Sequence, residues 1–328
     1  MIQRAHFGER IAQCRRQRGW SQAEVAEKLG VTSQAVSKWE RGAALPDVEL
    51  LLELSHLYGV SINEMLEDRD LLKSLADREY RIDGAAIFDS AAELCPEWAR
   101  DMIREGWIAR NWREANAKEE AYELDAGRRI AEAGGLILEI GAGPGGGFVP
   151  YILRADPDAS VILSDMSPTV VREWKKFLDK EADSPNLNYA AFDFCRIPFR
   201  DECMDVVSDR AGIGNAVTAA GGLGDKGAAL KEAYRVLKPG GMLVTTVGFI
   251  TRETLAALPE GAQKVLMEKR PDIFEDLYEE TMLAGFRKID SVVSGYWDTD
   301  NDESDIADLA RSLGVNLRFS DCVRYCRK

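Results

Sequence analysis

The stretch Leu136–Gly147 constrains the fold of this 328-residue chain more than any other, and it reads LILEIGAGPGGG. A short apolar run precedes Glu139, and glycines follow at Gly141, Gly143 and Gly145. Glycines at this spacing let the backbone turn sharply off a strand and approach a bound ligand where a Cβ atom would collide. The stretch therefore predicts a strand, a ligand-binding loop and a following helix. It also fits the dinucleotide pattern G-x-G-x-x-G, which is a weak indication when it stands alone.

Six further apolar runs predict the other strands of one sheet. They are Ser160–Asp165, Tyr189–Phe194, Met204–Asp209, Met242–Val247, Phe286–Val293 and Leu317–Tyr325. Asp165 ends the second strand about twenty residues after the glycines, where a carboxylate can hold a ribose diol. A helix over Ala228–Leu237 is stopped by Lys238–Gly241 before the fifth strand.

In this combination the chain resembles the class I S-adenosylmethionine (SAM) dependent methyltransferases, of the small-molecule, UbiE-like type. The E-x-G-x-G-x-G loop, the acidic ends of strands two and three, and the R-V-L-K-P-G-G turn before strand five stand in that family's order. A nicotinamide-binding site would not require an acidic end on strand three or the R-V-L-K-P-G-G turn before strand five. The resemblance implies an α/β Rossmann-like fold with a mostly parallel seven-stranded sheet, and SAM as cofactor. The cofactor-binding residues that it implies are Glu139, Gly141, Gly143, Gly145, Asp165, Met166, Asp193 and Phe194.

The segment Trp20–Glu40, WSQAEVAEKLGVTSQAVSKWE, predicts two short helices with a turn at Gly30. Ser21 and Glu24 form a capping box at the start of the first of them. With helices expected over His6–Arg18, Pro46–Tyr58 and Ser61–Leu66, the segment resembles the five-helix, all-α helix-turn-helix domain of the Cro/repressor (XRE-like) family. The resemblance implies that DNA is contacted by Gln22 on a phosphate and by Ser33, Gln34, Ser37 and Lys38 on base edges.

The distribution of charged residues indicates that the two ends of the chain have different binding partners. Residues 1–41 carry eight basic and four acidic side chains, whereas residues 68–328 carry 34 basic and 47 acidic ones, a net charge of −13. An acidic surface repels phosphate backbones. The fourth strand is also not followed by the N/D-P-P-F/Y sequence of amino-methylating DNA enzymes, and a Pro-Cys nucleophile is missing. We therefore expect DNA to bind residues 1–67, and the methyl acceptor to be a small molecule. The alternative for the first segment is a helical module for protein contacts that has lost DNA binding.

Between the two ends, residues 68–124 are helical by pattern and rich in aromatic side chains. We expect this segment to link residues 1–67 to a catalytic domain over 125–328 and to form a lid over the cofactor crevice. Phe88, Trp107 and Trp112 are the candidates for the acceptor pocket. The alternative is that these aromatic side chains only pack a helix against the sheet.

Both histidines, His6 and His56, precede the catalytic domain, which therefore has no histidine base. Asp209 and Arg210, at the end of the fourth strand, are the candidates for a catalytic role. The lack of histidine favours a nitrogen or sulfur acceptor, a carboxylate base, or an acceptor that arrives ionised. The six cysteines are scattered without a C-x-x-C pair, so we expect free thiols and no metal site.

The prediction is a SAM-dependent methyltransferase for a small molecule, fused to a sequence-specific DNA-binding domain of the transcription-regulator type. The alternative is a regulator whose methyltransferase-like domain only senses SAM or a metabolite. We further expect a cytoplasmic homodimer without a membrane anchor. No stretch approaches 18 apolar residues, and the first four residues do not open a signal peptide.

Overall fold

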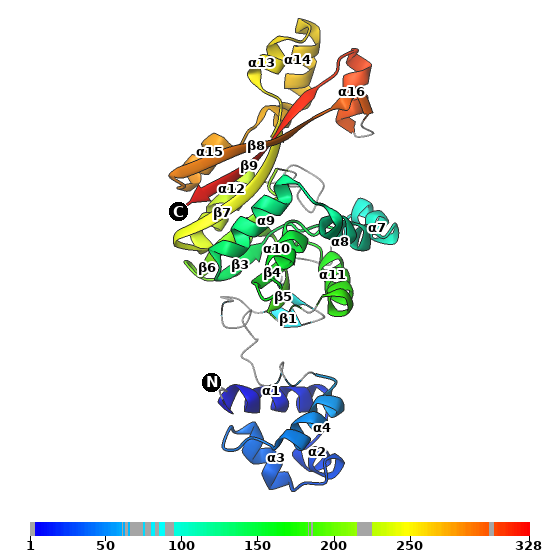
Figure 1. The fold of residues 1–328 in the computed structure, drawn as a ribbon, viewed down its shortest axis with the longest axis vertical. Coiled ribbons are helices and arrows are strands. Elements are labelled where there is room, and N and C mark those ends of the chain that lie inside the picture. The colour runs from blue at the N-terminus through cyan, green and yellow to red at the C-terminus, as the bar shows by residue number, and fades with distance from the viewer. Residues whose placement is uncertain are drawn as a thin grey trace. The chain divides into compact units, whose positions relative to one another are not determined.

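The computed structural model of the chain describes residues 4–60, 62, 65, 75, 80–82, 85–88, 95–182, 184, 186–214, 225–301 and 305–328. The chain divides into two compact units, Met1–Ser74 and Leu75–Lys328. Among the described residues, every helix is too short or too polar to cross a bilayer. Figure 1 labels the elements of both units.

The first unit contains four described helices: α1 (Arg4–Gln17), α2 (Gln22–Lys28), α3 (Ser33–Glu40) and α4 (Val48–Tyr58). Three of them begin at a side-chain cap, and the first of these caps is the capping box expected from the sequence. Ser21 and Glu24 form the capping box of α2, Thr32 accepts a hydrogen bond from the Ala35 N–H at the start of α3, and Asp47 accepts one from the Leu50 N–H at the start of α4. The fifth expected helix, over 61–66, lies outside the described residues apart from positions 62 and 65.

One apolar core holds these helices together. Its fully buried members include Phe7, Ile11, Val25, Val36, Trp39, Leu54 and Tyr58. A partly buried ion pair adds to it, because the Arg15 guanidinium reaches from α1 to the Glu40 carboxylate at the end of α3, with 2.6 Å between Nε and Oε1. The core and this ion pair fix α3 from its inner side, so its outer side is free to meet a partner.

The second unit is built on a nine-stranded sheet in the order β1-β2-β5-β4-β3-β6-β7-β9-β8. The strands are β1 (Tyr80–Ile82), β2 (Ala86–Phe88), β3 (Leu136–Glu139), β4 (Ser160–Asp165), β5 (Leu187–Ala191), β6 (Met204–Arg210), β7 (Leu237–Phe249), β8 (Lys288–Asp298) and β9 (Arg318–Arg327). The run from β2 to β7 is parallel, and the pairs β1–β2, β7–β9 and β8–β9 are antiparallel. The prediction of a mostly parallel α/β sheet is confirmed.

The sheet differs from the expected seven strands by a short hairpin, β1–β2, at its β5 edge. The hairpin lies in the segment that its pattern predicted to be helical. Its apolar run Ala86–Phe88 is buried, with Phe88 packed edge-to-face on Phe192 and Phe199. Such a short apolar run suits a buried strand as well as a helix, and in this case packing against β5 decides.

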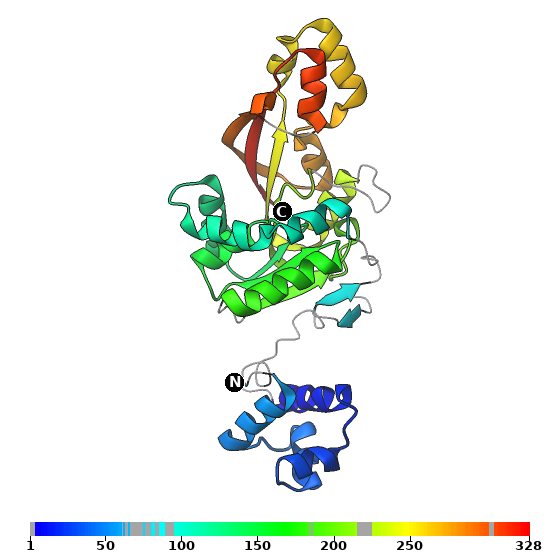
Figure 2. The same cartoon turned by 90° about the vertical axis from the view of Figure 1, so that its right-hand side faces the viewer.

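Helices cover both faces of the parallel strands (Figures 1 and 2). The helices of this unit are α7 (Glu97–Arg104), α8 (Trp107–Ala117), α9 (Tyr122–Ala133), α10 (Val149–Ala155), α11 (Pro168–Glu181), α12 (Lys226–Val236), α13 (Arg252–Ala256), α14 (Glu260–Lys269), α15 (Tyr278–Ala284) and α16 (Asp305–Leu313), with short 3-10 turns η2 (Phe194–Arg196), η3 (Pro271–Phe274) and η4 (Thr299–Asn301). Helices α7 to α11 pack together on one face, and α12 packs with α15 on the other. Strands β7, β8 and β9 continue past the parallel strands as an antiparallel arm, with α13, α14 and α16 near its far end (Figure 1).

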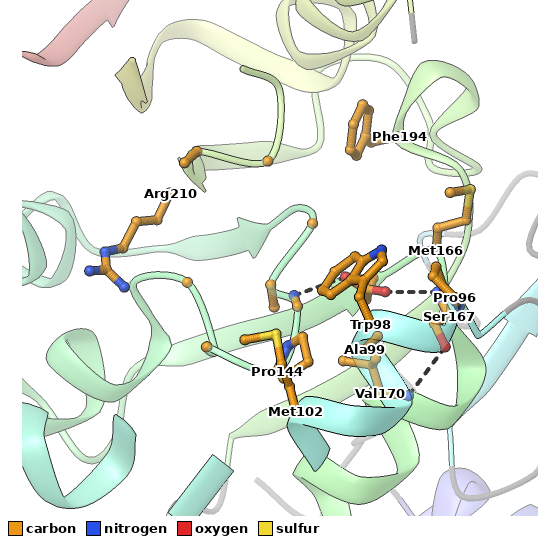
Figure 3. A pocket seen from close by; sticks show the side chains of 18 residues that line it. Pro96, Trp98, Ala99, Met102, Pro144, Met166, Ser167, Val170, Phe194 and Arg210 are labelled. Atoms are coloured by element: carbon orange, nitrogen blue, oxygen red, sulfur yellow. Dashed lines mark hydrogen bonds between the residues drawn. The ribbon is translucent and has the colours of Figure 1, made fainter. Parts of the chain in front are cut away.

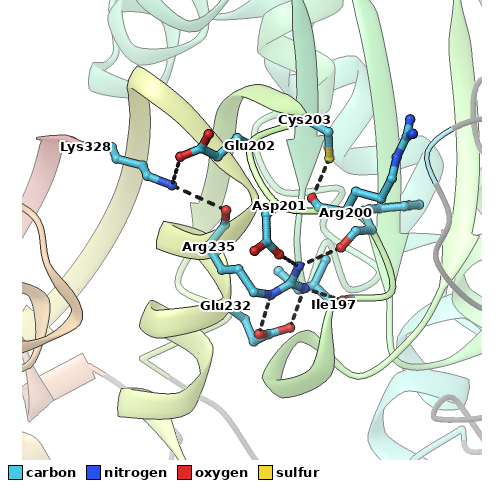
Figure 4. A network of polar contacts seen from close by, with 9 residues as sticks. Ile197, Arg200, Asp201, Glu202, Cys203, Glu232, Arg235 and Lys328 are labelled. Atoms are coloured by element: carbon cyan, nitrogen blue, oxygen red, sulfur yellow. Dashed lines mark hydrogen bonds and ion pairs between the residues drawn. The ribbon is translucent and has the colours of Figure 1, made fainter.

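A polar network ties α12 to the segment that follows β5 (Figure 4). The Arg235 guanidinium donates to the carbonyls of Ile197 and Phe199, both at 2.7 Å, and it pairs with the carboxylates of Asp201 and Glu232. Because η2 lies just before these carbonyls, the network positions the residues at the carboxyl end of β5.

Candidate functional site

The glycine loop follows β3 at the carboxyl edge of the parallel strands. Gly143 has φ +54° and Gly147 has φ +57°, a backbone conformation that residues with a side chain rarely adopt. A Cβ atom on Gly147 would lie 1.7 Å from the Glu139 Oε1 atom, so only glycine fits there. A Cβ atom on Gly145 would meet nothing within 4 Å. The loop is thus held tightly beneath Gly147 and has free space at Gly145.

Glu139, at the end of β3, is fully buried beneath this loop. Its Oε1 atom accepts a hydrogen bond from the Phe148 N–H at 3.0 Å, and its Oε2 atom accepts one from the Ser208 hydroxyl. Burial raises the pKa of this carboxyl to about 8. The sequence predicts that Glu139 takes part in cofactor binding, and the structure places its side chain under the loop, where it supports the backbone.

Asp165 ends β4 and connects that strand to the loop. Its Oδ2 atom accepts a hydrogen bond from the Gly143 N–H at 2.9 Å, and its Oδ1 atom accepts one from the Ser167 N–H at 2.8 Å. Burial raises the pKa of this carboxyl above its ordinary value, although both hydrogen bonds oppose the shift. Asp165 therefore fixes the loop and also presents a carboxylate to the space above it.

This space is a cavity of about 340 Å³ (Figure 3). The predicted residues that line it are Gly141, Gly143, Gly145, Asp165, Met166, Phe194 and Arg210. Figure 3 shows Trp98 and Met102, from α7, on the opposite side of the cavity from Phe194. Trp98 is 54% exposed, which is unusual for so large an apolar side chain and leaves its ring available to a ligand.

Asp193 is not among the described residues that line this cavity. It caps η2, where its Oδ1 atom accepts a hydrogen bond from the Cys195 N–H at 2.8 Å. The cap positions Phe194, which does line the cavity. The two neighbours therefore have separate roles, although the sequence predicts the same role for both.

The three aromatic residues predicted to line the acceptor pocket are not among the described residues that line this cavity. Phe88 is 2% exposed and belongs to the core at the edge of the sheet. Trp112 packs edge-to-face on Phe177. Trp107 donates a hydrogen bond to Glu105, and a guanidinium covers its ring. The aromatic residue of this segment that lines the cavity is Trp98, which the composition of the segment does not distinguish from its neighbours.

Asp209 and Arg210, the catalytic candidates, differ in position. Asp209 is fully buried, where its carboxylate accepts hydrogen bonds from the Thr245 hydroxyl at 2.7 Å and the Ile213 N–H at 3.0 Å. Burial raises the pKa of Asp209 to about 6. Arg210 lines the cavity and forms an ion pair with Glu123 at 2.9 Å. Next to it, Ala211 has φ +64°, a strained conformation of the kind found at binding sites.

A second cavity of about 290 Å³ adjoins the first. It is lined by Tyr122, Arg210, Ala211, Thr246, Val247, Gly248 and Asp321. Arg210 and Ala211 line both cavities. Among the described residues no cluster of histidine, cysteine, aspartate and glutamate side chains is arranged to hold a metal ion.

In the first unit, α3 presents polar side chains to its outer side. Ser33, Gln34 and Lys38 are exposed, and Ser37 is partly exposed. Gln22 is partly buried instead, and its amide donates a hydrogen bond to the Glu40 Oε2 atom at 2.8 Å. The predicted phosphate contact of Gln22 would have to compete with this bond, whereas the four residues predicted to contact bases are at least partly exposed.

Comparisons with known proteins agree with these two units. A helix-turn-helix family model matches residues 11–65, and a methyltransferase domain model matches residues 138–245. A prophage-derived helix-turn-helix transcriptional regulator of Bacillus subtilis, YonR, is 42% identical over 82 residues, which are 24% of this chain and 76% of the relative. The chain belongs to the helix-turn-helix family and carries a methyltransferase domain.

The methyltransferase domain is similar to the ubiquinone/menaquinone biosynthesis C-methyltransferase UbiE of Hydrogenovibrio crunogenus. The two are 29% identical over 158 residues, which are 48% of this chain and 55% of the relative, so the chain spans about half the length of that enzyme. Solved structures with similarity include an arsenic(III) S-adenosylmethionine methyltransferase from Chlamydomonas reinhardtii. It is 19% identical with a TM-score of 0.43, and the match covers 59% of this chain and 63% of that one.

Proposed function

We propose that the methyltransferase domain binds SAM at the glycine loop and transfers its methyl group to a small molecule. The volume of the first cavity falls in the range of about 300–1,000 Å³ that is typical of small-molecule sites. Its lining fits the three parts of SAM. Asp165 offers a carboxylate to the ribose hydroxyls, Phe194 and Met166 offer apolar surface to the adenine, and the space at Gly145 admits the methionine part.

SAM supplies a methyl group that is already activated on a sulfonium, so the protein has to orient the acceptor and exclude water. Trp98 and Met102 supply an apolar wall for that purpose. In this proposal residues 125–328 carry the reaction, and the preceding segment 68–124 contributes α7 as the cover of the cofactor.

The observation that carries the proposal is the bond between Asp165 and Gly143, which aims a carboxylate and a glycine turn at one space. We expect Asp165→Ala to weaken SAM binding about tenfold or more, because a charge-assisted hydrogen bond contributes roughly 1.5–3 kcal/mol. Asp165→Asn keeps one acceptor oxygen and should lose less. Titration calorimetry on the full chain measures both, with the exposed Asp158→Ala as the matched control. An unchanged affinity in Asp165→Ala would refute the assignment.

The acceptor is proposed to be a small molecule because both cavities are small and residues 68–328 carry a net charge of −13. Nucleic acid would need a positive channel leading to the methyl donor. Incubating the full chain with tritiated SAM and a metabolite extract, or with DNA or RNA, tests this point. Label in the nucleic acid would overturn the small-molecule proposal.

One observation favours the second candidate, a SAM or metabolite sensor. Asp165 and Arg210 are the only ionisable side chains among the described residues that line the first cavity, and Asp209 is buried away from it. A cavity with so few ionisable groups suits a binding protein as well as an enzyme with a nucleophilic acceptor. Formation of S-adenosylhomocysteine in the presence of acceptor separates the two.

For the helix-turn-helix unit we propose sequence-specific DNA binding through Ser33, Gln34, Ser37 and Lys38. We further propose that the DNA-binding form is a homodimer and that it acts in the cytoplasm. The exposure of these side chains on α3 supports the proposal. A two-fold dimer reads half-sites about one helical turn apart. Selection from random oligonucleotides, together with light scattering for the oligomeric state, tests both points. A chain that selects no sequence would instead carry a protein-interaction module.

A further inference from the structure

The second cavity has a more polar character than the first. Hydroxyls come from Tyr122 at the start of α9 and from Thr246 on β7, and a carboxylate comes from Asp321 on β9. The first cavity is lined mainly by glycines and apolar side chains. Since both cavities share Arg210 and Ala211, a molecule in the second lies next to a ligand on the glycine loop.

Asp321 lines this cavity without forming an ion pair with any described lysine or arginine. Its side chain is partly buried, and its Oδ1 atom accepts a hydrogen bond from the Trp297 indole at 3.2 Å. Burial raises the pKa of this carboxyl, and no described lysine or arginine forms an ion pair with it to oppose the shift. A partly buried carboxylate without a counter-charge is unfavourable, and a cationic ligand group would relieve it.

Arg210, the other charged residue of this cavity, already has a counter-charge. Its guanidinium lies 2.9 Å from the Glu123 carboxylate, which is itself 3.1 Å from the Lys118 ammonium. The Arg210 Nε atom is buried and has no hydrogen-bond partner among the described residues, so an oxygen atom of a ligand can bind there without displacing Glu123. A cation at Asp321 displaces no ion pair of the described residues either, so a cationic group is favoured at the Asp321 end of the cavity.

We propose that the second cavity is the acceptor site and that it takes a small amine-bearing molecule whose ammonium group is held by Asp321. The inference rests on the proposed function, because it gives the cavity a role in methyl transfer. An ammonium held by a carboxylate is protonated and has no lone pair, so it anchors the acceptor and is not itself methylated. The accepting atom lies at the other end of the molecule, toward Ala211.

The sheet register gives the length of such an acceptor. Arg210 pairs with Thr246 on β7, and Asp321 pairs with Gly248, two residues further along the same strand. With strands about 4.8 Å apart and about 3.3 Å of rise per residue, the Cα atoms of Arg210 and Asp321 lie roughly 12 Å apart. After allowance for the two side chains, a molecule that is several bonds long spans the space between the anchor and the junction of the cavities.

Three probes of one shape and different charge test this proposal: benzylamine, benzyl alcohol and benzoate, each titrated into the full chain at neutral pH and followed by ligand-observed NMR. We expect benzylamine to bind at least about tenfold more tightly than benzyl alcohol, and benzoate most weakly. Asp321→Asn keeps an oxygen for the Trp297 indole but removes the charge, so benzylamine should lose this advantage. Asp290→Asn, which removes an exposed charge on β8 outside the cavity, should leave it unchanged.

Tightest binding of benzoate, equal binding of all three probes, or an amine preference that survives Asp321→Asn would each overturn the proposal. The order of the probes on the unsubstituted chain does not depend on whether the variant folds. SAM affinity, measured by calorimetry on the same samples, separates this proposal from the proposed function. Binding of SAM without an amine preference refutes the cation site alone, and an amine preference without SAM binding refutes the methyltransferase proposal.

Discussion

The buried Glu139 leads to a prediction about stability. Its carboxyl has an ordinary pKa of 4.5 and a pKa of about 8 in the folded chain. Between these two values the folded protein holds a proton on Glu139 that the unfolded chain has released. Folding therefore takes up a proton, and the free energy of unfolding falls as the pH rises through this window. Below pH 4.5 the effect is absent, and above about pH 8 it is complete.

The size of the effect follows from the constant of about 1.4 kcal/mol for each pH unit. From pH 5.5 to pH 7.5, Glu139 should lower the free energy of unfolding by about 2.7 kcal/mol. Glu139→Gln resembles the protonated carboxyl and cannot ionise. Its amide oxygen can still accept from the Phe148 N–H, and its NH2 group can donate to the Ser208 hydroxyl oxygen. Any change in stability from this hydrogen bond does not depend on pH, so it cancels from the comparison between the two pH values.

Urea unfolding at pH 5.5, 6.5 and 7.5, followed by tryptophan fluorescence, measures the effect. Five of the seven tryptophans belong to the unit that contains Glu139, so fluorescence reports its transition. Relative to the unsubstituted chain, Glu139→Gln should gain about 2.7 kcal/mol between the first and last pH. The exposed Glu132→Gln is the control and should show no such gain. Parallel pH dependence of Glu139→Gln and the unsubstituted chain would refute the argument that this carboxyl is buried in its neutral form.

Two further predictions concern the surfaces that meet ligands. Trp98→Ala should weaken SAM binding several-fold in calorimetry, with little change in the urea concentration at which half of the protein is unfolded. The reason is that Trp98 is 54% exposed and covers the cavity more than it fills the core. Unchanged affinity would show that α7 is not part of the site. Gln34→Ala and Lys38→Ala should each weaken binding to the selected operator. We expect Gln34→Ala to lose roughly 1–3 kcal/mol of binding free energy and to relax the sequence preference, and Lys38→Ala to make the affinity less dependent on salt concentration. Fluorescence anisotropy across a salt series distinguishes the two effects, and retained affinity in both variants would show that α3 does not contact DNA.

The sequence was most informative where one residue type alone satisfies a local constraint. The glycine loop was found because a positive φ favours glycine at a particular position in the sequence. Asp165 was found because it is a charged residue at the end of an apolar strand. The capping box of α2 was found from a local pattern of the same kind.

Side-chain direction could not be found in this way. Phe88 and Trp98 come from the same aromatic-rich segment, yet one fills the edge of the sheet and the other borders the cavity. What separates them is the element that carries each one, a short buried strand in the first case and an amphipathic helix in the second. The second cavity also has no local pattern in the sequence that would predict it. Its polar groups come from α9, β7 and β9, which are distant in the sequence and are brought together only by the fold.

Two buried acids at the carboxyl edge hold the backbone turns that border the cavities. Glu139 accepts from the Phe148 N–H after the glycine loop and from a hydroxyl on β6, and Asp209 accepts from the Ile213 N–H after β6 and from a hydroxyl on β7. Each carboxyl thus joins the turn after its own strand to the next strand in the sheet. The glycine loop lines the first cavity, and Ala211, in the turn after β6, lines both cavities. Under the proposed function, the two buried acids therefore help to set the position of the acceptor relative to the donor. Buried carboxyls that hold the backbone in position, rather than an acid or base at the cavity surface, suit a reaction whose donor is already activated. Alignment is then the main contribution that the protein has to make.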